Sequence, residues 1–359
     1  MSIQQWTTPL TGLDSLRQTT APQPTPGPNE VLVEIHAVSL NYRDIEVTKG
    51  EYNHHKSVTQ ETPATVPCSD MSGVVTQVGP SVSRWRVGDR VLSTFLPDHL
   101  TGQVTPQMLA RGMGHPLPGV LATHRVFPEQ ALVKAPAYMQ DAEGATLPIA
   151  SVTAWMSVQG RLRAAVEKGE DVSRKVVLVQ GTGGVAVAGL QIAKAWGARV
   201  IVTSSSDAKL EQAKALGADF TINYRTTPDW EEEVNRFTEG NGVDIILETG
   251  GAKTLRKSFE CIAFGGLINC IGYVSGKMDE PEDRVNVNLL TLRRNVTLQG
   301  IINGPRDEFE RMVEFYEQHQ IRPVVNRVFG FAQAREAFEF VESGAHFGKV
   351  VIDVVGASQ

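Results

Sequence analysis

A glycine-rich turn, Gly181-Thr182-Gly183-Gly184-Val185-Ala186, has the residue types and spacing that bind the pyrophosphate of a dinucleotide. It follows the apolar run Val176–Val179 and precedes apolar residues at helical spacing, which end at Gly197. Glycines permit a tight turn and a close approach of the backbone, and the amides of a helix N-terminus face the negative charge. Because glycine triplets occur in many loops, the strand before the turn and the helix after it carry the prediction of nucleotide binding.

The loop after the next predicted strand favours NADPH over NADH. That strand ends at Thr203, and Ser204, Ser205, Ser206, Asp207 and Lys209 follow. A carboxylate at the strand tip binds the ribose hydroxyl of NAD and repels a 2′-phosphate, whereas hydroxyls donate hydrogen bonds to that phosphate and a lysine adds charge. A second interpretation, in which Ser206 or Asp207 caps the next helix, is compatible with the first, because the cap lies beyond the strand tip.

The elements that must position these residues divide the chain into two patterns. The first third is rich in short strands separated by Gly or Pro, as in VLVEIHAVSL and WRVGDRVLS. From about residue 150 to residue 290, short apolar strands alternate with helices, which is typical of a doubly wound parallel sheet. A helix, a strand, a helix and a final strand complete the chain, and the segment 96–119 is expected to be a long loop.

The composition is that of an ordinary globular protein. The chain has 359 residues, long enough for two domains, with a net charge of −6, which argues against a nucleic-acid or membrane-surface partner. No apolar run approaches the roughly 18 residues that span a bilayer. The N-terminal segment lacks a basic region followed by an apolar core, so we expect a cytoplasmic protein. The three cysteines, Cys68, Cys261 and Cys270, are too far apart to indicate a disulfide framework or a structural zinc site.

Four sequence blocks resemble the medium-chain dehydrogenase/reductase superfamily, in its zinc-free, quinone-oxidoreductase-like branch. They are GPNEVLVEIHAVSLNYRDI (27–45), SGVVTQVGPSVSRWRVGDRV (72–91), the glycine turn with its TSSSDAKL loop, and ADFTINYR with VDIILETGG. The resemblance implies an α/β protein with a β-rich, GroES-like catalytic domain and a Rossmann domain with a doubly wound parallel sheet. The catalytic domain is expected at 1–150 and 295–359, and the NADPH-binding Rossmann domain at 151–294.

The resemblance also implies that no catalytic metal is bound. Zinc-dependent alcohol dehydrogenases of the superfamily use a Cys, a His and a later Cys as ligands, and the matching positions here are Asn41, Ser69 and the region 150–151, which has no ligand type. Cys68 is one residue out of register and cannot form a site alone, because catalytic zinc needs three protein ligands. We interpret His54-His55 as a solvated loop dipeptide.

Without a Lewis acid, hydrogen-bond donors must stabilise the developing negative charge. The candidates are Asn41, Tyr42 and Tyr52. Tyr52 matches a tyrosine that approaches the nicotinamide in zinc-free reductases and can donate a proton, since a phenol is neutral at pH 7. Alternatively, Tyr42 is a packed aromatic residue, Tyr52 lines the cleft without transferring a proton, and Asn41 binds the nicotinamide ribose.

The resemblance also implies which residues bind the cofactor. Tyr224 is expected near the adenosine phosphate or, alternatively, only ends its strand; Lys349 is expected to reach the cofactor or, alternatively, to lie on the surface. Gly250 and Gly272 follow strands, where ligands of open α/β sheets bind, and Thr153 is expected beside the nicotinamide. The full set of cofactor-binding candidates is Thr153, Gly181, Gly183, Gly184, Val185, Ser204, Ser205, Lys209, Tyr224, Gly250, Gly272 and Lys349.

Together these features predict an NADPH-dependent, zinc-independent oxidoreductase that transfers hydride to an activated C=C bond or a quinone of a small electrophilic substrate. An enoyl reductase acting on a polyketide intermediate is a variant of this prediction. The alternatives are a carbonyl reductase for ketones or aldehydes and a non-catalytic NADPH-binding protein. The resemblance further implies a homodimer that pairs through a β-rich segment within Val285–Gln299.

Overall fold

The computed structural model describes residues 1–52 and 64–356, in two units. The first unit comprises Met1–Val152 and the chain from Gly304 onward, and the second comprises Thr153–Asn303. His54 and His55 lie outside the described residues. No helix in the described part of the chain has the length and apolar character needed to cross a membrane.

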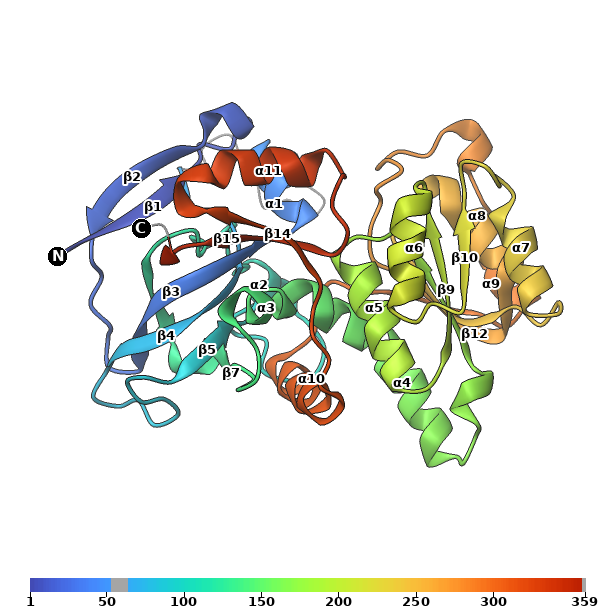
Figure 1. The fold of residues 1–359 in the computed structure, drawn as a ribbon, viewed down its shortest axis with the longest axis horizontal. Helices are drawn as coiled ribbons and strands as arrows, with labels where there is room; N and C mark the ends of the chain where they lie inside the picture. Colours follow the sequence, from blue (N-terminus) through green and yellow to red (C-terminus); the bar gives the residue numbers. More distant parts are fainter. Residues whose placement is uncertain (53–63, 357–359) are drawn as a thin grey trace. The chain divides into compact units, whose positions relative to one another are not determined.

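The first unit is the predicted β-rich, GroES-like domain. In its described residues a seven-stranded sheet has the order β14-β15-β3-β4-β5-β7, and β6 pairs with β3 (Figure 1). β1 and β2 form a separate antiparallel pair. The strands are β1 (Ser2–Thr7), β2 (Arg17–Pro22), β3 (Glu30–Leu40), β4 (Asp70–Val78), β5 (Arg90–Ser93), β6 (His124–Pro128), β7 (Leu132–Lys134), β14 (Val325–Gly330) and β15 (Lys349–Asp353).

Short helices surround this sheet. They are α1 (Tyr42–Thr48), α2 (Pro106–Leu109), α3 (Asp141–Gly144), α10 (Arg306–His319) and α11 (Ala334–Glu342). The expected long loop at 96–119 therefore contains one short helix, α2, whose N-cap Thr105 accepts a hydrogen bond from the Met108 amide. The core between the sheet and α11 is apolar and includes Leu16, Phe127 and Phe338, all of which are fully buried.

The end of β3 is the junction on which the candidate site depends. β3 alternates apolar and polar residues and pairs antiparallel with β4 on one side, with Ser39 opposite Asp70. On the other side it pairs antiparallel with β15, with Leu40 opposite Val350. Two strands that are far apart in the sequence thus bring Asp70 and Lys349 beside the residues that follow Leu40.

A polar network fastens α3 to this sheet. The carboxylate of Asp141 accepts hydrogen bonds from Arg90 (2.8 Å) and Ser72 (2.8 Å) and lies 2.8 Å from Nδ1 of His36. Burial alone would raise the pKa of Asp141, but these hydrogen bonds hold it well below its usual range. The bond to Asp141 raises the pKa of His36, against the opposite effect of burial.

This network predicts a pH window of greatest stability. The contribution of Asp141 is present above the ordinary Asp pKa and is lost as the pH falls through the depressed value, whereas that of His36 is complete below the ordinary His pKa and is lost as the pH rises through the raised value. We expect Asp141→Asn to lower the free energy of unfolding by about 2 kcal/mol between about pH 4 and pH 6.5, and by less above pH 7. Urea titrations across pH test this, with exposed Asp14→Asn as the control; an effect independent of pH would contradict it.

The second unit is the predicted Rossmann domain, because its six-stranded sheet is entirely parallel, in the order β10-β9-β8-β11-β12-β13. Its strands are β8 (Val176–Gln180), β9 (Arg199–Ser204), β10 (Phe220–Asn223), β11 (Val243–Glu248), β12 (Ile262–Cys270) and β13 (Thr297–Gly300). The strand order reverses between β8 and β11, and ligands of such sheets bind at the carboxyl ends of the strands at this point.

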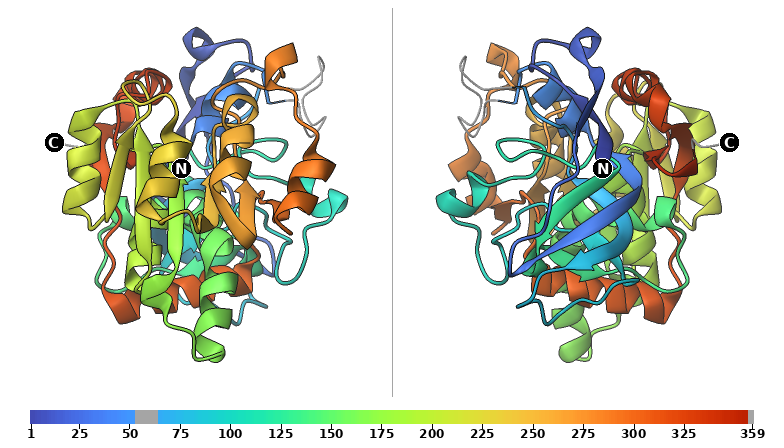
Figure 2. Two further views of the ribbon diagram at one scale, coloured as in Figure 1. Left: turned by 90° about the vertical axis from the view of Figure 1, so that its right-hand side faces the viewer. Right: turned by 90° about the vertical axis from the view of Figure 1, so that its left-hand side faces the viewer.

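Helices cover both faces of this sheet. α5 and α6 lie against one face and α7 and α8 against the other, as right-handed crossovers in opposite directions require (Figures 1 and 2). The helices are α4 (Val152–Glu167), α5 (Gly184–Ala195), α6 (Asp207–Ala215), α7 (Trp230–Phe237), α8 (Ala252–Cys261) and α9 (Val287–Arg293). The segment expected to be β-rich at 285–299 contains both kinds of element: α9, whose cap Asn286 accepts a hydrogen bond from the Leu289 amide (3.1 Å), and the start of the edge strand β13 at Thr297.

Candidate active site

The glycine turn joins β8 to α5, as predicted. Gly181 has φ +80°, a left-handed conformation that favours glycine, and its amide donates to the carbonyl of Thr203 at the end of β9 (2.8 Å). Gly183 is the N-cap of α5, and its carbonyl accepts the first helical hydrogen bond, from the Val187 amide (3.0 Å). The amides of the first turn of α5 therefore face the space beyond the carboxyl end of β8.

The space around the turn fits a ligand. A Cβ atom built on Gly181 or Gly183 would meet no protein atom within 4 Å. Gly183 also has an extended backbone that any residue adopts (φ −78°, ψ −173°), so the protein itself does not require glycine there. Gly189 differs, because a Cβ there would lie 2.6 Å from the Leu247 side chain, against which α5 packs. The turn is thus a cradle whose open side suits the pyrophosphate of a dinucleotide.

The ends of β9 and β10 bring together several candidates for the adenosine end of a cofactor. Ser204 is buried, and its carbonyl accepts a hydrogen bond from the Tyr224 amide (3.0 Å). The side chain of Tyr224 is exposed, directly after the last residue of β10. Lys209 is half-buried on α6, and burial lowers its pKa. Ser206 is the N-cap of α6 without a side-chain bond, and Asp207 is held by the Asn223 amide group (2.7 Å).

Glu248, at the end of β11, organises the switch point and was not predicted. Its carboxylate is buried, makes no ion pair within the described part of the chain, and accepts hydrogen bonds from the side chain of Gln180 (2.7 Å), from Ser258, and from the amides of Gly250 (2.9 Å) and Gly251 (3.0 Å). The hydroxyl of Thr254 donates to it as well. The signal in the sequence was an acidic residue directly after the apolar run 245–247 of β11. Glu248 therefore joins the residue before the glycine turn to the loop after β11.

Two predicted glycines lie around this network. A Cβ on Gly250 would lie 2.3 Å from the hydroxyl of Thr254, and one on Gly272 would lie 3.0 Å from the carbonyl of Thr249. Close internal packing thus accounts for both glycines. Their contact with a cofactor stays a prediction.

Thr153 lies at the start of α4 and is buried. Its carbonyl accepts a hydrogen bond from the Ser157 hydroxyl (2.8 Å), but its own hydroxyl has no hydrogen-bond partner among the described residues. A buried hydroxyl without a partner costs free energy, so an acceptor or donor from a ligand suits this position.

In the first unit, the structure brings Asn41 and Lys349 together. Asn41 is the N-cap of α1, and its backbone amide donates to the carboxylate of Asp44 (2.8 Å). Lys349 begins β15 and is only 6% exposed, so the interpretation that it lies on the surface is wrong. Its ammonium donates to the backbone carbonyl of Leu40 and to Oδ1 of Asn41 (2.7 Å).

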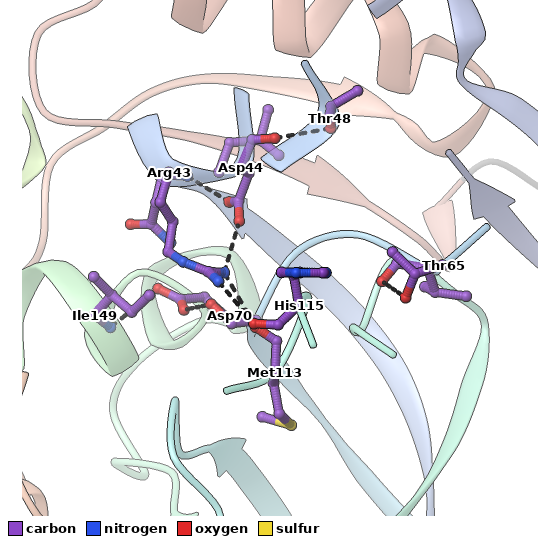
Figure 3. Close-up of polar contacts among 12 residues, drawn as sticks. Arg43, Asp44, Thr48, Thr65, Asp70, Met113, His115 and Ile149 are labelled. Atoms are coloured by element: carbon purple, nitrogen blue, oxygen red, sulfur yellow. Dashed lines mark hydrogen bonds and ion pairs between the residues drawn. The ribbon is translucent and has the colours of Figure 1, made fainter. Parts of the chain in front are cut away.

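Arg43, two residues after Asn41, connects α1 to the 113–115 loop and was not among the predicted site residues (Figure 3). Its guanidinium lies 3.5 Å from the carboxylate of Asp44 and donates to the carbonyls of Met113 (3.1 Å) and His115 (3.2 Å). It also lies over the Tyr52 ring, 4.7 Å from the centroid. One side chain thus connects the start of α1 to the 113–115 loop.

The two tyrosines lie in different environments. Tyr52 is buried and packs with Leu10 and Val47, beneath the Arg43 guanidinium. Tyr42 is 51% exposed on α1, so the interpretation that it is a packed aromatic residue is wrong. A catalytic role for either phenol stays a prediction.

Two buried carboxylates, Asp44 and Asp70, and the Cys68 thiol lie near Asn41 and Lys349. The carboxylate of Asp70 accepts hydrogen bonds from the Ser69 hydroxyl (2.6 Å) and the Ile149 amide (3.1 Å). Burial raises the pKa of Asp70, against the Lys349 charge and the Ser69 bond, and raises the pKa of Asp44 to about 6, against the charge of Arg43. Burial also raises the pKa of the Cys68 thiol well above its usual range. Across residues 1–52 and 64–356, no three His, Cys, Asp or Glu side chains are grouped to hold a metal ion.

Family models match both units. Residues 27–137 match the model "Alcohol dehydrogenase GroES-like domain", and residues 184–318 match "Zinc-binding dehydrogenase". A zinc-type alcohol dehydrogenase-like protein of Schizosaccharomyces pombe is 41% identical over 96% of this chain and 97% of its own length. A quinone oxidoreductase-like protein 2 homolog of Nematostella vectensis is 27% identical over 91% of this chain and 82% of its own.

Solved structures agree with this likeness. A crystal structure of a Sinorhizobium meliloti protein assigned to the alcohol dehydrogenases has a TM-score of 0.85 and 41% identity, covering 98% of this chain and 99% of that one. A crystal structure of an NAD-dependent alcohol dehydrogenase has a TM-score of 0.83 and 31% identity over 98% of this chain and 99% of that one.

Proposed function

The chain belongs to the medium-chain dehydrogenase/reductase superfamily and is an oxidoreductase, and we propose that it is an NADPH-dependent reductase of activated C=C bonds or quinones that works without a metal. The observation that carries the proposal is the hydrogen bond from the Lys349 ammonium to Oδ1 of Asn41. Asn41 and Ser69 match the first two zinc-ligand positions of the zinc-dependent members, and their amide and hydroxyl are poor zinc ligands. A buried ammonium beside Asn41 also disfavours a second cation there.

In this proposal, residues of the second unit bind the cofactor and residues of the first unit act on the substrate. The glycine turn from Gly181 to Val185 holds the pyrophosphate, and Thr153 offers its unpartnered hydroxyl to the nicotinamide amide. The bound cofactor supplies the hydride. In the first unit, the Asn41 amide stabilises the negative oxygen that forms on the substrate, and Tyr52 or water supplies the proton.

A substrate panel tests the proposal. Purified protein is treated with EDTA and assayed for NADPH consumption with quinones, enones, enoyl thioesters, ketones and aldehydes, with NADH in parallel. We expect turnover of quinones or activated alkenes that prefers NADPH and is unaffected by chelation. Turnover of ketones or aldehydes alone would favour a carbonyl reductase, the alternative that the likeness to alcohol dehydrogenases supports. Tight NADPH binding without any turnover would favour a non-catalytic role, and loss of activity with EDTA would contradict the metal-free mechanism.

Lys209 is expected to set the preference for NADPH. Its ammonium, together with the hydroxyls of Ser204 and Ser205, is proposed to bind the 2′-phosphate, an interaction that NADH lacks. We expect Lys209→Ala to raise the KM for NADPH about 10-fold and to leave the KM for NADH unchanged. Lys214→Ala, near the other end of α6, is the matched control, since Lys214 pairs with Glu211. An equal change for both cofactors would contradict the assignment.

The proposed assembly is a homodimer in the cytoplasm, without a nucleic-acid or membrane partner. β13 is the edge strand of the parallel sheet, and no described strand pairs with its outer side. Leu289 (57% exposed) and Leu292 (75%) lie on the neighbouring helix α9, and Phe264 in β12 is 79% exposed. An unpaired edge beside exposed apolar side chains favours pairing with a second copy. Light scattering coupled to size exclusion tests this, and a monomer of 39.1 kDa would contradict it.

A further inference from the structure

The amide of Asn41 has only one orientation compatible with its neighbour. Lys349 is buried at the start of β15, and its Nζ atom lies 2.7 Å from one end of that amide. An ammonium has three donors and no acceptor, so the end that faces it must be the oxygen. The other end, Nδ2, therefore points away from Lys349 as a donor.

Two carboxylates, Asp70 and Asp44, lie near this donor, and the Asn41 side chain is close enough to Asp70 to lower its pKa, although no acceptor among the described residues is within hydrogen-bond distance of Nδ2. The Asp70 carboxylate accepts from Ser69 on one oxygen and from Ile149 on the other. Oδ2 of Asp44 accepts from the backbone amide of Asn41 itself. Nδ2 of Asn41 is buried and has no hydrogen-bond partner among the described residues, although Asn41 as a whole is partly exposed. An unpartnered buried donor costs free energy until an acceptor reaches it.

We propose that Lys349 is a positioning residue, which holds the Asn41 amide so that Nδ2 donates to the oxyanion of the substrate. This rests on the proposed reductase function. Hydride adds to the β-carbon of an enone, the electron pair of the C=C bond moves to the carbonyl oxygen, and the resulting enolate oxygen accepts the hydrogen bond from Nδ2. A proton from Tyr52 or water then adds to the α-carbon, and the carbonyl re-forms. Without the ammonium, the amide is free to turn and to present its oxygen, which would repel the enolate.

The test is a double-mutant cycle between the two residues. We expect Lys349→Met, which removes the donors and keeps the length, to lower kcat about 30-fold with the KM for NADPH unchanged, and Asn41→Ala to lower it about 100-fold. In the Asn41→Ala background, Lys349→Met is expected to change kcat less than about 3-fold. Lys349→Arg, whose guanidinium also has only donors, is expected to restore kcat to within about 5-fold of the wild type. Lys134→Met, an exposed lysine of β7, is the control.

A binding measurement separates this inference from the reductase function. 4-Nitrophenol serves as the probe, because its phenolate mimics the enolate oxygen and absorbs differently from the phenol. We expect the wild type and Lys349→Arg to favour bound phenolate, and Asn41→Ala and Lys349→Met to lose this preference. Phenolate binding with this pattern but no turnover of any substrate would overturn the reductase proposal alone. Additive losses in the cycle would overturn the inference, because Lys349 would then act by its own charge, and so would a failure of Lys349→Arg to restore activity. If Lys349→Met lowered the melting temperature as well as kcat, and Lys349→Arg restored neither, Lys349 would have a purely structural role.

Discussion

Gly183→Ala is expected to raise the dissociation constant for NADPH by about 30-fold, or roughly 2 kcal/mol, while the melting temperature stays the same. The backbone of Gly183 is extended, and a Cβ there meets no protein atom within 4 Å, so the folded protein accommodates alanine without strain. The added methyl group instead occupies the space into which the pyrophosphate must come. Isothermal titration with NADPH and thermal unfolding measure the two quantities separately.

Two glycines of the same unit are matched controls. Gly160, in α4, also has nothing within 4 Å of its Cβ position, so Gly160→Ala is expected to leave NADPH binding unchanged and to stabilise the helix slightly. Gly189→Ala places its Cβ against Leu247 and is expected to lower the melting temperature. If Gly183→Ala bound NADPH as tightly as the wild type, the cradle would not be the pyrophosphate site.

Glu248→Ala is expected to lower the free energy of unfolding by about 4 kcal/mol. The change removes the acceptor of donors from Gln180, Ser258, Thr254 and two backbone amides, all of them around one buried carboxylate. Each donor that remains buried without a partner costs free energy. Urea unfolding of the whole protein measures the loss.

Glu260→Gln, on the exposed side of α8, is the control for Glu248 and is expected to change stability by less than about 0.5 kcal/mol. We also expect Glu248→Ala to weaken NADPH binding, because the carboxylate fixes the loop after β11 and the end of β8 before Gly181. An unchanged stability would mean that water replaces the carboxylate at the switch point.

The parts of the fold that depend on local patterns were predictable. The glycine turn lies between a short apolar run and an amphipathic helix, and such a strand-turn-helix unit is determined by about 30 neighbouring residues. The segment 285–299 shows the limit of this approach. Its β-forming residues favoured a strand, but the strand β13 begins only at Thr297, and the Asn286 cap starts helix α9 over Val287–Arg293.

The arrangement of Asn41, Arg43 and Lys349 in the first unit was predictable only in part. Asn41 came from a motif, but its contact with Lys349 joins residues 308 positions apart, and the pairing of β3 with β15 creates it. Arg43 lies inside the same motif, yet its role depends on carbonyls of the 113–115 loop. Glu248 is visible in the sequence as an acidic residue that ends a strand, but its partners come from separate segments and only the fold brings them together. Sequence periodicity contains no information about such long-range contacts.

The late arrival of β15 has a consequence for the chain as it is made. β3 is synthesised early, and its residues 37–40 have their backbone partners in β15, which emerges only after the whole parallel sheet of the second unit. Domains made first can fold first during synthesis, so the nucleotide cradle can be complete while the end of β3, paired with β4 on one side, still lacks its neighbour on the other. An unpaired, largely apolar strand edge invites pairing with other chains. The segment that provides the cation beside Asn41 also closes that edge, so the chain becomes competent for chemistry and protected from aggregation in the same step.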